Sequence, residues 1–401
     1  MALTFEQARA CVLREVPASM DIESVAAADA DQRVLAEQIR ADRDYPPFPR
    51  SARDGFAIRA ADVPGVLRVI GEVRAGETFR RSVHAGNAVE IMTGAPVPEG
   101  ADAVVMIEHT RREAELAKIG RTAKVGENIT PRGAEARGGD VLLEPGQRLG
   151  YAEIALLAMV GHAHVQVFRR PRVAILPTGD EIVEEGAQPG AAQIRNSNAA
   201  ALAVQVRRAG GVPQIFPIAR DNDESTRGLV SRGLEADLLL LSGGVSAGKY
   251  DVVERVLAAA GGEFLFDRVL IQPGQPVVFG RVVGNGSRDG VAKFFFGLPG
   301  NPASTMVTFE IFARAAIEKM QGLAHPPLRL LRASLTRELR HKPGLTRFLP
   351  ARLSADGVTV EPEPWKGSGD VVALARANAF LMVESDRESW AAGDDIRVLL
   401  K

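Results

Sequence analysis

The sequence holds almost no cysteine and no cluster of histidines. Cys11 is the single cysteine among 401 residues, so no disulfide can form within the chain. Such cysteine usage fits a reducing cytoplasm. The six histidines lack the spacing of a zinc site, and we interpret the closest pair, His162 and His164, as strand residues on one face. A disulfide scaffold is therefore excluded, and a zinc domain is not expected.

Excess charge and long hydrophobic runs are also missing. Lys and Arg number 49 against 50 Asp and Glu, a formal charge of −1. This balance argues against nucleic acid or an anionic membrane as the main partner. No uninterrupted apolar run reaches about 18 residues, so no membrane span is expected. The N-terminus lacks the basic and apolar regions of a signal peptide, and we expect a cytoplasmic protein.

The chain does have enough apolar residues, 46%, for a sizeable core, and its length suggests about three domains at about 150 residues each. Short strands between glycines predict a β-rich domain over 41–140. Alternating strands and helices over 170–325 predict a central parallel sheet flanked by helices. A C-terminal, barrel-like β domain follows over 326–401. Residues 1–40 and 141–169 are expected to form a helical or extended linking domain.

Local signals predict where several helices begin and end. Thr4 and Gln7 form a capping box, and the pattern after them predicts helix over residues 4–40. The prolines of "DYPPFPRSARDGFA" (44–57) then impose an extended path. In "NSNAAALAVQVRRAGG", Ser197 or Asn198 is expected to cap a helix that ends at the paired glycines.

Four expected strands of the central domain run into distinctive loops. The loops are "PTGDE" (177–181), "ARDND" (219–223), "SGGVSAGKYD" (242–251) and "GLPGNPAS" (297–304). Because ligands of parallel sheets bind beyond the carboxyl ends of the strands, we expect these loops to share one edge.

The four loops would bring carboxylates and amide donors together. They supply Glu181, Asp221 and Asp251, the amides of Gly243 and Gly244, and the N-terminus of the helix that begins at Pro302. Carboxylates beside amide donors suit a hard cation that bridges to phosphate oxygens.

Each loop also has a plainer interpretation. The paired glycines could form only a tight turn, Asp180 or Glu181 could be favourable charges at a helix start, and Asp221 could be a cap. "PGNP" is more specific, because Asn301 can cap a helix whose first residue is Pro302. The convergence of four such loops favours a ligand site over these alternatives.

The third loop nearly matches the phosphate loop of nucleoside triphosphatases. From Gly243 it reads G-G-V-S-A-G-K-Y, with Tyr250 where the motif has a serine or threonine that binds Mg²⁺. The loop also follows about the third strand of its domain, whereas a phosphate loop normally follows the first. We therefore do not interpret it as a nucleoside triphosphatase motif.

Seven motifs occur in an order that resembles one family. They are "FPRSARDGFA", "IMTGAPVPEGADAVV", "ILPTGDEI", "SGGVSAGKYD", "PGQPVVFG", "GLPGNPAS" and "GSGDVVALARAN". Together they resemble the molybdopterin molybdenumtransferase family, which includes the C-terminal domain of gephyrin, over nearly the whole chain.

The resemblance implies a molybdopterin-binding central domain and a transferase activity. The reaction is Mg²⁺-dependent insertion of molybdate into adenylylated molybdopterin with release of AMP, in an elongated homodimer whose sites are shared between subunits. The implied catalytic residues are Asp54, Thr93, Glu181, Asp221 and Asp251, of which the last three would bind the metal. The implied substrate-binding residues are Ser242, Gly243, Gly244, Ser246, Gly248, Gln272, Gln275, Pro299, Gly300, Asn301, Pro302, Arg347 and Ser368.

Three departures from the family pattern keep alternatives open. Gln272 and Gln275 stand where the family often has lysines, which would weaken capture of an oxyanion unless other bases such as Arg347 help. Glu135 stands where an aspartate is usual, and Arg53 where a methionine is usual. A non-catalytic molybdopterin-binding or scaffold protein and a tungstate-inserting transferase remain the alternatives.

Overall fold

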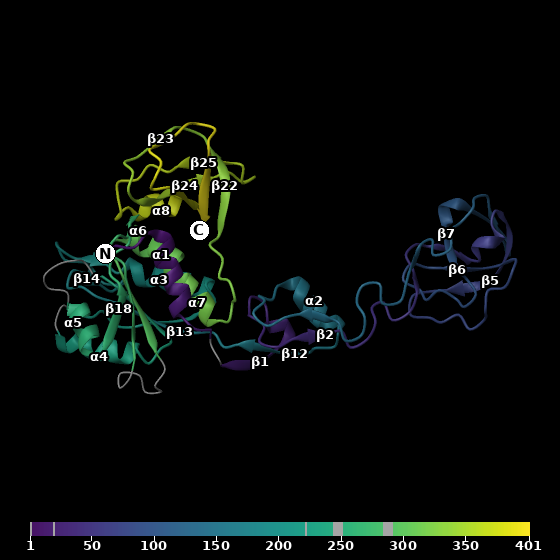
Figure 1. The fold of residues 1–401 in the computed structure, drawn as a ribbon, viewed down its shortest axis with the longest axis horizontal. Helices are drawn as coiled ribbons and strands as arrows, with labels where there is room; N and C mark the ends of the chain where they lie inside the picture. Colours follow the sequence, from purple (N-terminus) through teal and green to yellow (C-terminus); the bar gives the residue numbers. More distant parts are fainter. Residues whose placement is uncertain (1, 19–20, 221–222, 244–251, 284–291) are drawn as a thin grey trace.

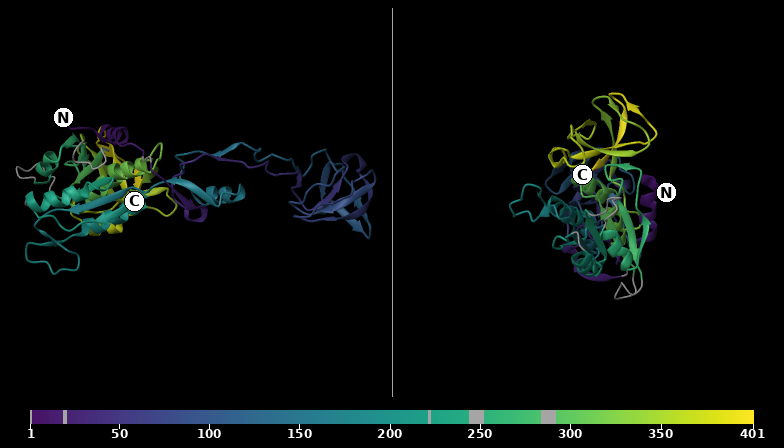
Figure 2. Two further views of the ribbon diagram at one scale, coloured as in Figure 1. Left: turned by 90° about the horizontal axis from the view of Figure 1, so that it is seen from below. Right: turned by 90° about the vertical axis from the view of Figure 1, so that its left-hand side faces the viewer.

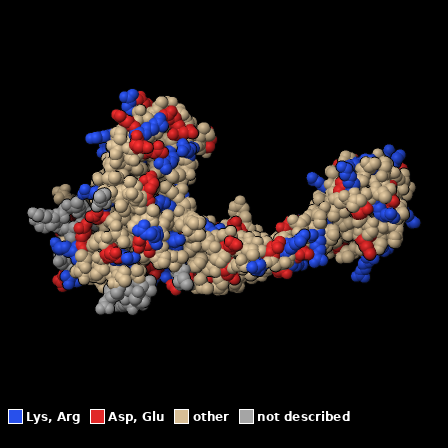
Figure 3. Space-filling model, in the orientation of Figure 1, with Lys and Arg blue, Asp and Glu red and all other residues tan. Residues whose placement is uncertain are grey.

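The protein is elongated, with a slender middle part. The computed structural model describes residues 2–18, 21–220, 223–243, 252–283 and 292–401. A central mass and a domain above it lie at one end of the molecule, and a separate β-rich domain lies at the other (Figures 1 and 2). Basic and acidic side chains are interspersed over the face drawn in Figure 3, in keeping with the balanced net charge.

The central domain is built on a six-stranded sheet. In order across the sheet, the strands are β16 (Val212–Ile215), β13 (Arg172–Pro177), β17 (Leu238–Ser242), β21 (Lys293–Leu298), β20 (Val278–Val282) and β18 (Gly262–Phe266). The first four are parallel, as expected, whereas β20 runs antiparallel to both of its neighbours, β21 and β18, which corrects the expectation of a parallel sheet at this side. The links at 267–277 and 283–292 are short, and a parallel crossover needs about a dozen or more residues.

Helices cover both faces of this sheet. One face carries α1 (Phe5–Glu15), α3 (Ser197–Arg208), α6 (Pro302–Thr308), a π-helical turn (Phe309–Ala313) and α7 (Arg314–Met320). The other face carries α4 (Asp223–Gly233) and α5 (Val252–Ala259). Alternate strand residues pack into the two layers, for example Leu240 into the first and Leu241 into the second. The expected fold class, a helix-flanked α/β domain combined with β domains, is confirmed.

Two helix boundaries differ from those expected. The capping box of Thr4 and Gln7 is confirmed, but α1 ends at Glu15 rather than continuing to residue 40. Pro17 explains the early end, because a proline disfavours helical backbone at the residue before it. The cap of α3 is Asn196, whose side chain accepts a hydrogen bond from the Ala199 amide at 3.1 Å, and not Ser197 or Asn198.

The middle part consists of short paired segments around a small core. They are β1 (Ile22–Ala26) with β12 (His164–Phe168), β2 (Ile39–Arg40) with β11 (Val141–Leu143), β3 (Arg50–Ser51) with β10 (Ile129–Thr130), the 3₁₀ turn Ala27–Asp29, and α2 (Tyr151–Met159). The pair β3–β10 leads to the β-rich domain, and there Arg50 forms an ion pair with Glu135 at 2.5 Å. No helix in the described ranges is long and apolar enough to cross a membrane.

Two further β structures occupy the ends of the molecule. The β-rich sheet consists of β7 (Ala103–Met106), β4 (Gly55–Ile58), β6 (Asn87–Ile91), β5 (Gly65–Val73), β9 (Leu116–Ile119) and β8 (Thr110–Glu113), with 3₁₀ turns at Ala60–Asp62 and Ile107–His109. The C-terminal domain contains β22 (Leu330–Leu335), β24 (Thr346–Leu353), β25 (Thr359–Pro362), β26 (Ala379–Val383) and β28 (Asp395–Leu400), with α8 (Val371–Arg376) and the pair β23 (Leu339–Arg340) and β27 (Ser389–Trp390). Pairing of β26 with β24 closes the C-terminal strands into a barrel.

The ring of Phe5 joins three parts of the chain. Phe5 is 4% exposed, and its ring centroid lies 6.0 Å from that of Phe312 in the π-helical turn and 5.5 Å from that of Phe348 in β24. The N-terminal helix is thus packed between the central domain and the barrel. The domain boundaries expected from the sequence stay a prediction.

We predict that Phe5→Ala lowers the free energy of unfolding by about 3–5 kcal/mol, because it removes a buried ring and leaves a cavity. Denaturant unfolding followed by circular dichroism and by tryptophan fluorescence measures this change. Both tryptophans, Trp365 and Trp390, lie in the C-terminal part, so fluorescence reports on the barrel. Tyr151→Ala is the control, because Tyr151 is 90% exposed and its loss should change stability by no more than about 0.5 kcal/mol. Equal stability of the two variants would contradict the proposed role of Phe5.

Candidate functional site

Three parallel strands of the central sheet end at the same level. Pro177 at the end of β13 lies opposite Ser242 of β17, which lies opposite Leu298 of β21. The next residues are joined by backbone hydrogen bonds, from the Thr178 amide to the Ser242 carbonyl at 3.0 Å and from the Gly243 amide to the Leu298 carbonyl at 3.1 Å. The loops after these strands therefore start side by side, as the sequence predicts.

The fourth loop joins the same edge. Thr178 forms a parallel bridge with Ala219, and the Gly179 amide donates to the Ala219 carbonyl at 3.1 Å. The described parts of all four loops thus meet.

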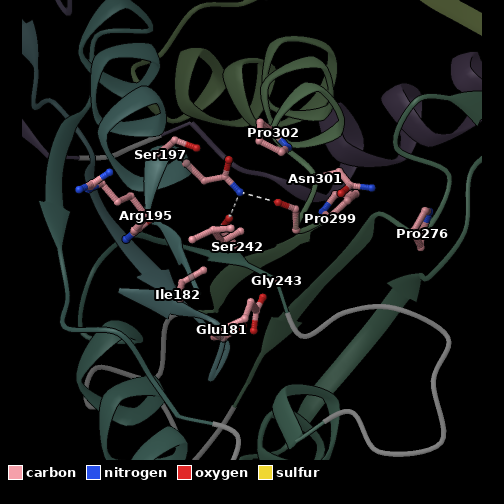
Figure 4. Close-up of a pocket in the computed structure, with 15 residues that line it drawn as sticks. Glu181, Ile182, Arg195, Ser197, Ser242, Gly243, Pro276, Pro299, Asn301 and Pro302 are labelled. Atoms are coloured by element: carbon pink, nitrogen blue, oxygen red, sulfur yellow. Dashed lines mark hydrogen bonds between the residues drawn. The ribbon is translucent and has the colours of Figure 1, made fainter. Parts of the chain in front are cut away.

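A cavity of about 360 Å³ opens at this edge (Figure 4). Its lining includes expected residues, namely Glu181, Ser242, Gly243, Pro299, Gly300, Asn301 and Pro302. It also includes residues that the sequence analysis did not single out as ligand contacts, namely Thr178, Ile182, Ile194, Arg195, Asn196, Ser197, Asn198 and Pro276. Most of these come from the start of α3 and from the short parallel strands β14 (Ile182–Val183) and β15 (Ile194–Arg195). In the sequence, the two asparagines that flank Ser197 were the only feature that could have indicated polar contacts at the start of α3.

The loop that carries Glu181 is held through its backbone. One nitrogen of Arg220, Nη1, lies 3.5, 3.3 and 3.2 Å from the carbonyl oxygens of Gly179, Asp180 and Ile182. Gly179 has φ +137°, and a Cβ there would lie 2.5 Å from a carboxylate oxygen of Glu181. Strand β14 follows, so Glu181 does not start a helix.

Among the described residues, the carboxylate of Glu181 itself has no partner. No donor or cation in the described ranges contacts it, whereas its backbone carbonyl accepts the Ile194 amide at 2.9 Å. The backbone of Glu181 is therefore fixed while its carboxylate, in the wall of the cavity, remains available to a ligand.

Two of the described backbone amides near the cavity already have acceptors within the protein. The Gly243 amide donates to Leu298, as described above, and Pro302 has no N–H. The Ala303 amide donates to the Ser368 carbonyl at 2.9 Å. The Gly243 amide and the first amide of α6 are therefore not free in the described structure, because neighbouring carbonyls accept them.

Asn301 lies at the N-cap position of α6 but makes no capping hydrogen bond. Its side-chain nitrogen donates instead to the Ser368 hydroxyl at 2.9 Å. Ser368 thus ties the C-terminal domain to the wall of the cavity, and its expected role at the border of the substrate site stays a prediction.

Gln272 and Arg347 lie opposite each other where β19 (Ile271–Gln272) pairs with β24. The Arg347 guanidinium donates to the side-chain oxygen of Gln272. Gln275 is half-buried and precedes Pro276, which lines the cavity. None of these three polar residues lines the cavity described here.

Asp54 and Thr93 form a pair in the β-rich domain. One oxygen of Asp54 accepts the Thr93 amide at 2.6 Å and the Thr93 hydroxyl at 2.8 Å. These hydrogen bonds lower the pKa of Asp54, so its carboxylate is ionised at neutral pH. The β-rich sheet next to Asp54 lies at the far end of the molecule from the central domain (Figures 1 and 2). Within one chain, this pair and the cavity are therefore not brought together.

Several expected site residues lie outside the described residues. They are Asp221, Gly244, Ser246, Gly248 and Asp251. The described ranges contain no group of three His, Cys, Asp or Glu side chains arranged to hold a metal ion, and Glu181 is the one expected metal ligand among them.

Comparison with known proteins covers the chain almost completely. Residues 3–161 match a family model described as "MoeA N-terminal region (domain I and II)", residues 174–319 one described as "Probable molybdopterin binding domain", and residues 332–401 one described as "MoeA C-terminal region (domain IV)".

Individual relatives agree with these models. The molybdopterin molybdenumtransferase of Staphylococcus epidermidis is 35% identical over 379 residues, which cover 92% of this chain and 88% of the relative. The enzyme of the same name from Staphylococcus aureus is 34% identical over 392 residues, 95% of this chain and 92% of the relative. A solved molybdopterin biosynthesis moeA protein from Pyrococcus horikoshii OT3 superposes with a TM-score of 0.85 at 28% identity, with both chains covered completely. The chain therefore belongs to the molybdopterin molybdenumtransferase family.

Proposed function

We propose that this protein inserts molybdate into the dithiolene of adenylylated molybdopterin and releases AMP, a late step of molybdenum cofactor biosynthesis. The observation that carries the proposal is the Glu181 carboxylate, which has no partner in the described ranges and lies in a cavity at the carboxyl edge of the sheet. The names of the relatives and the match to a molybdopterin-binding family model support the substrate class.

The chain's own residues fit a Mg²⁺-dependent reaction. Mg²⁺ prefers oxygen ligands and is usually held by one or two carboxylates together with phosphate oxygens. Glu181 offers such a carboxylate, and we expect Asp221 and Asp251 to complete the set. When bound, the cation would neutralise charge on the pyrophosphate. Glu181 would hold it, and the Pro299–Pro302 loop would position the phosphate groups.

No nucleophile of the protein is needed in this reaction. The dithiolene sulfurs of the substrate accept the metal, so the protein has to position groups and balance charge. The cavity lining in the described ranges contains neither histidine nor cysteine. Cys11 is buried in α1 within the apolar cluster of the central domain.

The distance between the Asp54–Thr93 pair and the cavity favours a site shared between subunits. In a two-fold dimer the same contact occurs twice, so the β-rich domain of each subunit can close the cavity of the other. The family resemblance implies both the dimer and essential roles for Asp54 and Thr93. We therefore propose a homodimer with two composite sites.

The first test measures AMP release by the wild-type protein supplied with adenylylated molybdopterin, molybdate and Mg²⁺. We predict that Glu181→Gln lowers this rate by about 10²-fold or more, because the amide keeps the shape and loses the charge. Glu184→Gln, on the neighbouring loop outside the cavity lining, is the control. An unchanged rate in Glu181→Gln would overturn the role of Glu181. A wild-type protein that binds molybdopterin but releases no AMP would favour the scaffold alternative.

The second test asks whether two chains share a site. Inactive Asp54→Ala and Glu181→Ala proteins are mixed and allowed to exchange subunits. In a shared arrangement each heterodimer has one intact site, and random pairing makes about half the dimers heterodimeric, so roughly a quarter of the wild-type rate should return. If mass spectrometry confirms exchange and no activity returns, each site lies within one chain.

The third test concerns the glutamines that replace lysines. We predict that Gln275→Lys lowers the molybdate concentration for half-maximal turnover severalfold, because a charged hydrogen bond contributes about 1.5–3 kcal/mol against about 1 kcal/mol for a neutral one. Gln214→Lys, at an exposed position of β16, is the control. The same titration with tungstate tests the alternative oxyanion. An unchanged molybdate requirement would show that Gln275 does not face the oxyanion.

A further inference from the structure

One carboxamide in the cavity wall links three of the surrounding segments. Asn198, in the first turn of α3, is 9% exposed. Its side-chain nitrogen donates to the Ser242 hydroxyl oxygen at 3.0 Å and to the Gly300 carbonyl oxygen at 2.8 Å, as the dashed lines in Figure 4 show. The start of α3, the end of β17 and the turn before α6 are thereby held at fixed distances.

The orientation of this carboxamide follows from its partners. The Gly300 carbonyl oxygen can only accept a hydrogen bond, so the NH₂ group of Asn198 has to face it. The same NH₂ group then faces Ser242, whose oxygen acts as the acceptor. The carboxamide oxygen of Asn198 is buried and has no hydrogen-bond donor in the described ranges, so the amide contributes to this wall only through its nitrogen.

The hydrogen bond from Asn198 determines the direction in which the Ser242 hydroxyl can donate. Because the Ser242 oxygen accepts from Asn198, its own O–H is directed elsewhere, and no acceptor for it occurs in the described ranges. Ser242 lines the cavity, so its hydroxyl is available as a donor to a bound ligand. The amides of Gly243 and Ala303 are not available, because carbonyls of the protein accept them.

We propose that Asn198 is a positioning residue that keeps the Ser242 hydroxyl as a hydrogen-bond donor to a phosphate group of the substrate. This inference rests on the proposed function, which places a pyrophosphate in the cavity. Phosphate oxygens only accept hydrogen bonds at their ionised positions, which matches a hydroxyl held as a donor. The start of α3 also favours negative charge through the helix dipole.

The test is a double-mutant cycle of Asn198→Leu and Ser242→Ala. Leu resembles Asn in shape and carries no charge, so it removes the donor without adding repulsion. Each single substitution should raise KM for adenylylated molybdopterin about tenfold, since a hydrogen bond to a charged group contributes about 1.5–3 kcal/mol, and should leave kcat within about twofold. If Asn198 acts through Ser242, the double variant should be no worse than Ser242→Ala. Effects that multiply to about a hundredfold would show a merely structural role and overturn the proposal.

Gln205→Leu is a matched control on the same helix. Gln205 also uses a carboxamide nitrogen as a bridge, donating to the Met306 carbonyl at 3.1 Å and to the Glu310 carboxylate at 2.7 Å, but it does not line the cavity. Its loss should leave KM unchanged. If Asn198→Leu does not fold, as judged against Gln205→Leu by circular dichroism, Asn198→Ala takes its place in the cycle.

A binding measurement separates failure of this inference from failure of the proposed function. Calorimetric titration with inorganic pyrophosphate and Mg²⁺ needs no turnover. We expect each single substitution to weaken pyrophosphate binding about tenfold, with no further loss in the double variant. If pyrophosphate binding follows this pattern across the variants but the wild-type protein releases no AMP, only the proposed function is contradicted. Pyrophosphate binding that is unaffected by Asn198→Leu would overturn the inference.

Discussion

The common level at which β13, β17 and β21 end is the constraint on which the site depends. Parallel pairing places Pro177, Ser242 and Leu298 side by side, so residues that are far apart in the sequence begin their loops at one edge. Both faces of these strands are buried under helices, which fixes their register, because a shift by one residue would turn apolar side chains to the wrong layer. The cavity is therefore a consequence of core packing rather than of the loops alone.

The same edge explains why several backbone amides beside the cavity are not open to a ligand. Strand pairing continues one residue past the strand ends, and this consumes the amides of Thr178 and Gly243. At the start of α6, Pro302 has no N–H and the Ala303 amide donates to the carbonyl of Ser368. The described wall still offers the Glu181 carboxylate and the Ser242 hydroxyl, together with the buried Thr178 hydroxyl and the side chains of Arg195 and Ser197. A carboxylate and a hydroxyl donor suit a cation and a phosphate bound together, which is a narrower specification than a general anion site.

The sequence predicts the parts of the molecule that depend on local patterns. Buried apolar runs followed by glycine or proline indicate the central strands and their loops, and the meeting of those loops follows from parallel topology. The hydrogen-bond partners of a side chain can lie far away in the sequence, and local patterns do not predict them. The bonds of Asn198 join residues 44 and 102 positions apart, and nothing in "NSN" indicates those partners. The end of α1 could have been predicted from Pro17, because its effect on the preceding residue is local.

The long middle part keeps the Asp54–Thr93 pair away from the cavity of its own chain. Asp54 is ionised and fixed by two hydrogen bonds from Thr93, yet its sheet is separated from the cavity by the linking segments. A carboxylate held in this way on an exposed surface loses side-chain entropy without gaining burial, which favours a role in recognition over a role in stability. The barrel, in contrast, touches the cavity wall directly through Ser368 and Asn301. The C-terminal domain thus contributes to the cavity wall of its own chain, whereas the β-rich domain at the other end of the molecule would serve a second copy in the proposed dimer.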